Sequence, residues 1–130
     1  MNDEADEPAL ILVVEDNPAN QMLIEAVLTG AGYSIVVVGS APEALDSIED
    51  RRPDLILMDI QLPGMDGLSL TRQLKADPGT ASIPVVALTA HALATDHQLS
   101  LDAGCVGYIT KPFDTRLLPH QIAGFLIASG

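Results

Sequence analysis

Five polar side chains stand at or just after the ends of four short apolar runs: Glu15, Asp16, Asp59, Thr89 and Lys111. Asp59 follows the run Leu-Ile-Leu-Met and opens a loop rich in proline and glycine at 61–67. An ionisable group at the end of a buried strand indicates a function. Three carboxylates, a hydroxyl and an ammonium are the groups that hold a hard divalent cation and stabilise a transferring phosphoryl group.

The elements that position these groups follow a repeating pattern. A short apolar run, a polar loop and an amphipathic stretch recur five times. Continuous apolar runs rich in β-branched residues are typical of a parallel sheet covered on both faces. We expect strands over 10–15, 34–38, 54–59, 84–88 and 106–110.

Local signals predict the helices between these strands. We expect one helix to begin at Asn17-Pro18 and end near Gly30 and Gly32, one to begin at the capping box 40–43, and others to span Gly67–Lys75, to span His91–Ala103 and to begin near Leu118. The fourth is the weakest, with Leu93 near its start and Leu99 near its end. Apolar positions expected in the other helices are Leu23, Ile24, Val27, Leu28, Ala41, Ala44, Leu45, Ile48, Leu70, Leu74, Leu118, Ile122 and Phe125.

Five such units predict an α/β protein with a doubly wound (βα)5, flavodoxin-like fold, in which the strand order is 2-1-3-4-5. This order places Glu15 and Asp16 directly beside Asp59. Three neighbouring carboxylates repel one another unless a cation is present, and Mg²⁺ suits oxygen ligands with open positions. Asp59 would then be the nucleophile that accepts the phosphoryl group.

Four motifs at these strand ends resemble one family. They are Glu-Asp-Asn at 15–17, Met-Asp-Ile-Gln-Leu-Pro-Gly-Met-Asp-Gly at 58–67, Ala-Leu-Thr-Ala-His at 87–91 and Tyr-Ile-Thr-Lys-Pro-Phe at 108–113. Together they resemble the CheY-like receiver domain of two-component response regulators, closest in texture to single-domain DivK-type regulators and to receivers of hybrid kinases. The resemblance covers roughly residues 9–128. One mild departure is Glu15, where aspartate is also common.

The resemblance implies a role for each matching position. Asp59 is the phosphoacceptor, and Glu15, Asp16, Asp59 and the backbone carbonyl of Gln61 bind Mg²⁺. Thr89 contacts the phosphoryl group and moves on activation. Lys111 pairs with phosphate oxygens, and the Lys111-Pro112 peptide bond is expected to be cis. Tyr108 occupies the switch-aromatic position. Gln61 and His91 lie two residues beyond Asp59 and Thr89, where they are expected to modulate dephosphorylation by flanking the attacking water.

The implied function is signalling by phosphorelay. A histidine kinase or a histidine phosphotransfer protein donates the phosphoryl group, and the surface formed by the fourth helix, the fifth strand and the fifth helix changes its affinity for a downstream protein. The domain is expected to be no enzyme beyond its own phosphotransfer and autodephosphorylation. No output domain is expected, with residues 1–8 forming a flexible acidic tail and 9–130 the receiver domain.

Composition limits the partners and the compartment. The net charge of −12 disfavours binding to nucleic acid or to an anionic membrane surface. No apolar run approaches the roughly 20 residues that span a bilayer. Cys105 is the only cysteine, so no internal disulfide can form, and we expect it to be a small buried residue in a cytoplasmic protein.

Two other functions use similar residues. Phosphatases of the haloacid-dehalogenase type also form an aspartyl phosphate, but their nucleophile lies on an early strand in an Asp-x-Asp setting, with the acidic pair late. Here the acidic pair comes first and position 61 is glutamine. A receiver-like module that binds partners without phosphorylation is the third reading, and the complete set of site residues argues against it.

Overall fold

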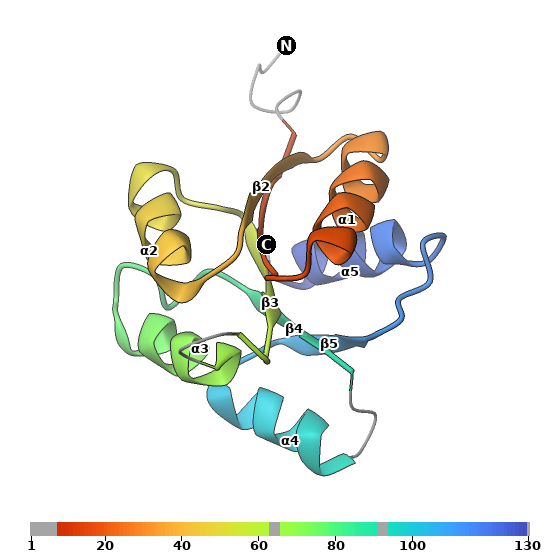
Figure 1. Ribbon diagram of the computed structural model, residues 1–130. Helices are drawn as coiled ribbons and strands as arrows, with labels where there is room; N and C mark the ends of the chain where they lie inside the picture. The colour runs from red at the N-terminus through yellow and green to blue at the C-terminus, as the bar shows by residue number, and fades with distance from the viewer. Residues whose placement is uncertain (1–7, 63–65, 91–93, 130) are drawn as a thin grey trace.

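The computed structural model describes residues 8–62, 66–90 and 94–129 as a parallel sheet between two layers of helices (Figure 1). The strands are β1 (Leu10–Val14), β2 (Ser34–Val38), β3 (Leu55–Asp59), β4 (Val85–Thr89) and β5 (Gly107–Thr110). The helices are α1 (Pro18–Gly30), α2 (Ala41–Asp50), α3 (Gly67–Ala76), α4 (Ala94–Ala103) and α5 (Leu118–Ser129). The sheet order is β2-β1-β3-β4-β5, which confirms the predicted fold and order.

The first three helices begin where the sequence predicts, because a side chain caps each of them. The oxygens of Asn17, Ser40 and Asp66 accept hydrogen bonds from backbone N–H groups in the first turns of α1, α2 and α3. For the predicted helix at 91–103, residues 91–93 lie outside the described part of the chain.

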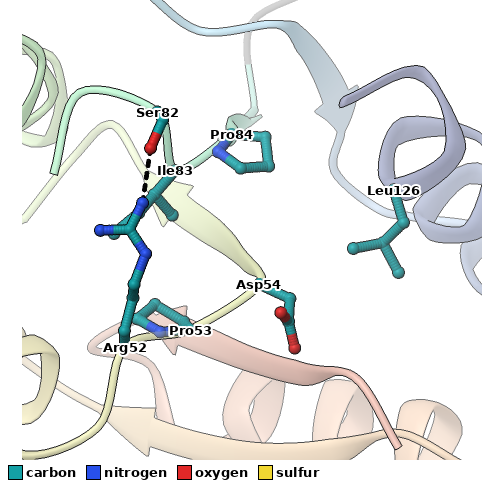
Figure 2. Close-up of a pocket in the computed structure, with 7 residues that line it drawn as sticks. All are labelled: Arg52, Pro53, Asp54, Ser82, Ile83, Pro84 and Leu126. Atoms are coloured by element: carbon teal, nitrogen blue, oxygen red, sulfur yellow. Dashed lines mark hydrogen bonds between the residues drawn. The ribbon is translucent and has the colours of Figure 1, made fainter. Parts of the chain in front are cut away.

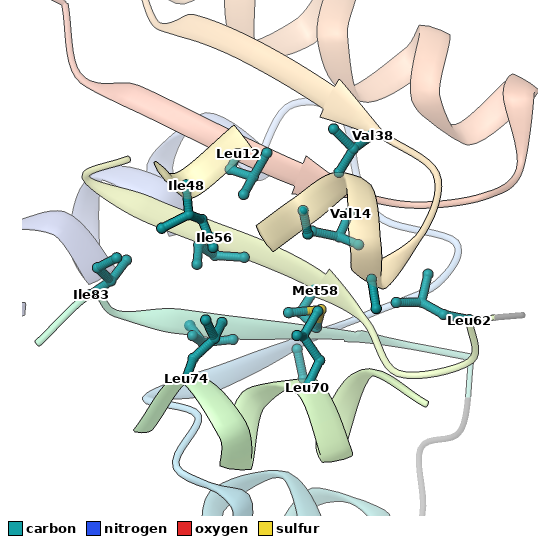
Figure 3. Close-up of a cluster of buried hydrophobic side chains, with 14 of the residues drawn as sticks. Leu12, Val14, Val38, Ile48, Ile56, Met58, Leu62, Leu70, Leu74 and Ile83 are labelled. Carbon is teal, nitrogen blue, oxygen red and sulfur yellow. The ribbon is translucent and has the colours of Figure 1, made fainter. Parts of the chain in front are cut away.

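The core lies on both faces of the sheet, because every side chain of β1, β3 and β4 is buried. Alternate residues of these strands contribute to the two clusters. One cluster packs under α2 and α3 and contains Ile48, Leu70 and Leu74, and Figure 3 shows Leu70 beside Met58 of β3. The other packs under α1 and α5. Cys105 is buried in the first cluster, as predicted.

Two leucines of the predicted helices are exposed, and one of them, Leu23, belongs to the predicted apolar stripe of α1. Leu23 on α1 is 41 % exposed, because Ile24 and Leu28 face the sheet and Leu23 lies about 100° around the helix from Ile24. On α4, Leu99 is 48 % exposed while Ser100 and Ala103 are buried. The apolar pattern of α4 therefore does not mark its buried face.

A cavity of about 270 Å³ lies at the amino ends of β3 and β4, away from the predicted site (Figure 2). Its wall includes Asp54, whose carboxylate accepts a hydrogen bond from the N–H of Leu10 at 2.7 Å. Arg52 donates to the Ser82 hydroxyl and to the Gly79 carbonyl. These bonds fasten the segment before β4 to the end of α2.

Candidate phosphoacceptor and metal site

The predicted site residues meet at the carboxyl edge of the sheet. Asp59 is the last residue of β3, the central strand, and is 4 % exposed. Glu15 and Asp16 directly follow β1, and Lys111 directly follows β5. Thr89 ends β4 and is 1 % exposed. Because parallel strands end at one edge, these five residues from four separate segments of the sequence share one crevice.

The ammonium of Lys111 is held between two carboxylates. Its Nζ atom lies 2.8 Å from Oε2 of Glu15 and 3.0 Å from Oδ2 of Asp59. Burial lowers the pKa of Lys111, but the two carboxylates more than offset this effect, so the pKa is raised overall. The Lys111 backbone N–H also donates to the carbonyl of Thr89 at 2.7 Å, and the Lys111-Pro112 peptide is cis, as expected. Lys111 therefore brings a fixed positive charge to the crevice.

Glu15 is fully buried and both of its oxygens are engaged. Oε1 accepts a hydrogen bond from the N–H of Asn17 at 3.1 Å, and Oε2 faces Lys111. Burial raises the pKa of the Glu15 carboxyl, and the nearby carboxylate of Asp59 raises it further, against the lowering effect of Lys111. The side-chain amide of Gln21 on α1 donates to the backbone carbonyl of Glu15. This bond ties the acidic loop to the first helix.

The carboxylate of Asp59 is fixed from both sides. Oδ1 accepts the N–H of Gln61 at 2.9 Å, and Oδ2 faces Lys111. The chain returns close to Asp59 at Gly67, whose N–H donates to the carbonyl of Ile60 at 3.1 Å. A Cβ on Gly67 would lie 2.1 Å from the carbonyl oxygen of Asp59, so only glycine permits this approach.

The three carboxylates form a cluster that fits a divalent cation. One oxygen each from Glu15, Asp16 and Asp59 lies within 4.8 Å of the others, and Asp16 is exposed. The buried Oε2 of Glu15 has the Lys111 ammonium as its ion partner but no hydrogen bond within the described residues. An all-oxygen set of high negative charge, open to water at Asp16, suits Mg²⁺ better than a soft metal.

The remaining predicted site residues, Tyr108, Gln61 and His91, are not members of the carboxylate cluster. Tyr108 lies on β5 and is 38 % exposed. The side chain of Gln61 is exposed beside the site. His91 lies outside the described residues. The sequence analysis missed the contact of Gln21 with Glu15 and the pairing of Glu15 with Lys111. Gln21 lies one helical turn after Asn17, and this spacing could have indicated the contact of Gln21 with Glu15. No local signal indicates that Glu15 pairs with Lys111.

The chain matches the model of the response regulator receiver domain over residues 11–123. It belongs to the response regulator receiver domain family. The matched range includes every predicted site residue. Membership of this family excludes the alternative function of a phosphatase of the haloacid-dehalogenase type. Within the described residues no helix combines the length and the apolar character needed to cross a membrane.

Individual proteins similar to this chain are also response regulators or receiver domains. The chain is 40 % identical to the polar-differentiation response regulator DivK of Brucella anthropi over 119 residues, which cover 92 % of this chain and 97 % of that protein. A response regulator from Chloroflexus aurantiacus superposes with a TM-score of 0.89 at 32 % identity, covering 93 % of this chain and 99 % of the other.

A third relative is the receiver domain of a sensor histidine kinase from Pseudomonas aeruginosa, whose structure has a magnesium ion coordinated in the active-site cleft. It superposes with a TM-score of 0.83 at 41 % identity, covering 92 % of this chain and 98 % of that chain. The receiver fold predicted from the sequence is therefore confirmed by the sheet order and by the structural relatives.

Proposed function

We propose that Asp59 accepts a phosphoryl group from a histidine kinase or a histidine phosphotransfer protein. The observation that carries this proposal is the fixed carboxylate of Asp59, with Gln61 N–H on one oxygen and Lys111 Nζ 3.0 Å from the other. A carboxylate oxygen of Asp59 attacks phosphorus while the bond between phosphorus and the donor's histidine nitrogen breaks. The electron pair of that bond leaves with the imidazole.

Lys111 stabilises the charge that develops during this transfer. Its ammonium already lies against Asp59 and is held there by Glu15, so little reorganisation is needed as negative charge moves to the phosphoryl oxygens. The hydroxyl of Thr89, at the end of the neighbouring strand, is the second group expected to contact those oxygens.

Mg²⁺ is the cofactor that the cluster fits. Glu15, Asp16, Asp59 and the backbone carbonyl of Gln61 would hold it, and when bound it supplies positive charge to the phosphoryl oxygens. The magnesium ion in the Pseudomonas receiver supports this assignment by analogy. Within this chain, Asp16 is the exposed member of the cluster and the best placed to bind the ion directly.

Phosphorylation is expected to act through a switch at the other end of the crevice. Thr89 moves toward the phosphoryl group, and Tyr108 turns into the space that Thr89 leaves. The responding surface consists of α4, β5 and α5, whose exposed apolar side chains include Leu99 and Leu101 of α4, Tyr108 of β5 and Ile127 of α5. Such coupling is typically worth about 1–3 kcal/mol, enough to alter the affinity of a partner protein.

The signal ends by hydrolysis of the acyl phosphate. Gln61 and His91 are the residues assigned to tune this rate, because both follow site residues by two positions and can orient or exclude the attacking water. The protein acts as a phosphoacceptor with self-catalysed transfer and dephosphorylation, in the cytoplasm, through protein partners. Its net charge of −12 disfavours nucleic acid and membrane surfaces as partners.

The switch can be tested without a kinase, using beryllofluoride as a phosphoryl mimic. Adding beryllofluoride and Mg²⁺ to the isotopically labelled protein should shift the NMR signals of Asp59, Thr89, Tyr108 and α4. Thr89→Ala should still bind the mimic at Asp59 but lose most of the shifts near Tyr108 and α4. The full wild-type shift pattern in Thr89→Ala would refute the switch, and no shifts in either protein would refute the function.

A further inference from the structure

A groove between α2 and α3 is not part of the site described above. It has a volume of about 310 Å³ and is lined by the C-terminal halves of both helices and the segment after α3. Its volume is at the lower end of the range for pockets that hold small ligands or side chains. Both helices lie on the same side of the sheet (Figures 1 and 3).

The floor of the groove is apolar. Leu45 is half-buried on α2, while Ile48 and Leu74 are 9 % and 2 % exposed and belong to the core cluster beneath. Figure 3 shows Ile48 and Leu74 among the buried side chains of this cluster. The floor is therefore the outer surface of a packed core, and it can accept an aliphatic side chain without rearrangement.

The rim of the groove is acidic. Glu49 on α2 and Asp77 after α3 line it, and among the described residues no lysine or arginine does. Asp77 uses Oδ1 to accept the N–H of Gly79 at 2.9 Å, and Glu49 is exposed. Asp46 and Asp50 add two exposed carboxylates to α2. Glu49 and Asp77 therefore supply the negative charge of the rim over the apolar floor, and Asp46 and Asp50 stand outside the lining.

Two cations close in sequence to the lining, Arg52 and Lys75, make their hydrogen bonds outside it. Arg52 donates to the Gly79 carbonyl and, as Figure 2 shows, to the Ser82 hydroxyl. Lys75 donates its ammonium to two backbone carbonyls of the same segment. Both side chains stabilise the connection between α3 and β4, and within the described residues neither forms an ion pair with Glu49 or Asp77.

We propose that this groove is a docking surface for a basic, amphipathic segment of a partner protein. Aliphatic side chains of that segment fill the floor, and its Lys or Arg side chains pair with Glu49 and Asp77. Charge complementarity selects this occupant, because a second copy of a chain with net charge −12 would bring further negative charge to an acidic rim.

The place of the groove in the fold predicts how it behaves. The C-terminal end of α2 leads into the start of β3, whereas Asp59 ends β3 at the opposite edge of the sheet. A partner in the groove therefore leaves the phosphoacceptor crevice open. Docking there should be insensitive to the state of Asp59, unlike binding at the surface of α4, β5 and α5.

The test uses two short synthetic peptides of identical composition, containing only leucine, lysine and alanine. One has its leucines on a single helical face, and the other is scrambled so that it has no apolar face. Each is titrated into the isotopically labelled full chain and followed by NMR. The amphipathic peptide should give saturable shifts at Leu45, Glu49, Gln73 and Asp77, with an affinity about tenfold higher than that of the scrambled peptide.

Charge variants distinguish the groove from general attraction to an acidic protein. Glu49→Gln with Asp77→Asn should weaken binding about three- to tenfold. Gln73→Lys, which puts a cation on the lining, should weaken it further. The control for the double variant is Glu25→Gln with Asp46→Asn, which removes the same charge outside the lining. The control for Gln73→Lys is Thr29→Lys on α1. Each control should change the affinity less than about twofold. Asp59→Asn should bind the peptide as the wild type does.

Four results would overturn the proposal. Equal binding of both peptides, or equal loss in the groove and control variants, would show that only net charge attracts the peptide. Shifts confined to α1 or to α4 and β5 would place the docking surface elsewhere. Self-association of the chain that shifts the groove signals in the absence of peptide would assign the groove to a second copy.

Discussion

The ammonium of Lys111 lies 2.8 Å from the buried Oε2 of Glu15, and this ion pair holds the lysine in place beside the phosphoacceptor carboxylate. Glu15 has no exposed surface, while the side chain of Lys111 is 18 % exposed. The pair explains how the chain keeps an acid in the interior at the end of β1. It also makes Glu15 a positioning residue for Lys111 as well as a candidate metal ligand.

Removing the ammonium should destabilise the fold. Lys111→Met leaves the buried Glu15 carboxylate without its ion partner, at a cost of about 1–3 kcal/mol in the free energy of unfolding. Adding Glu15→Gln should recover part of that loss, because the buried charge disappears. Urea unfolding followed by circular dichroism measures all four corners of this cycle. Strictly additive effects would show that the two side chains do not stabilise each other.

Asp16 should control magnesium binding. Asp16→Ala is expected to weaken Mg²⁺ affinity by about tenfold or more, and by more than Glu15→Ala, because Asp16 is the exposed carboxylate of the cluster. The same substitution should raise the stability of the metal-free protein by about 1 kcal/mol, since it relieves repulsion. Calorimetric titration checks the affinity, with Asp46→Ala on α2 as the control. Unchanged affinity in Asp16→Ala would refute the metal assignment.

Gly107 should be intolerant of a side chain. A Cβ on Gly107 of β5 would lie 2.4 Å from a ring carbon of Phe125 on α5, so Gly107→Ala should cost about 1–3 kcal/mol. Gly124→Ala is the matched control, since nothing lies within 4 Å of its Cβ, and it should stabilise α5 by about 0.5–1 kcal/mol. Thermal unfolding compares them. Combining Gly107→Ala with Phe125→Leu should cost less than the sum of the two changes.

Cys105 should make stability fall at alkaline pH. Burial raises the pKa of its thiol, so the thiol stays protonated in the fold while it ionises in the unfolded chain near pH 8.5. Above that pH the unfolded state binds fewer protons, and the free energy of unfolding decreases until the folded thiol also ionises. Burial lowers the pKa of Lys75, so the titration of this lysine raises the free energy of unfolding as the pH increases. This contribution is common to the wild type and to a variant that lacks the thiol, so it cancels when the two are compared.

The measurement compares the wild type with Cys105→Ala by urea unfolding at neutral and alkaline pH. The wild type should lose more stability between the two conditions than Cys105→Ala does. An equal loss in both proteins would show that the thiol titrates alike in the folded and unfolded states.

The fold was predictable because its signals are local. Apolar runs ending in polar residues marked the strands, and Asn17, Ser40 and Asp66 stand where helices begin. Each strand boundary was correct to within one residue, so Glu15 follows β1 instead of ending it. The parallel sheet then placed Asp59 next to the acidic pair without any knowledge of side-chain contacts.

The details of the site could not be predicted in the same way. The pairing of Lys111 with Glu15 depends on rotamers chosen by burial at the end of β1, and nothing near either residue in the sequence encodes it. The exposure of Leu99 depends on how α4 rotates against the sheet, where small Ser100 and Ala103 are buried instead. Both features arise from tertiary packing, which can override hydrophobic periodicity.

Phosphorylation of Asp59 is the central claim, and intact-protein mass spectrometry after incubation with acetyl phosphate and Mg²⁺ tests it most directly. The account predicts a gain of one phosphoryl group in the wild type, no gain in Asp59→Asn, and no gain without Mg²⁺. Asp54→Asn, which alters a carboxylate at the opposite end of β3, should be labelled like the wild type. Labelling of Asp59→Asn equal to that of the wild type, or no labelling of the wild type, would contradict the account.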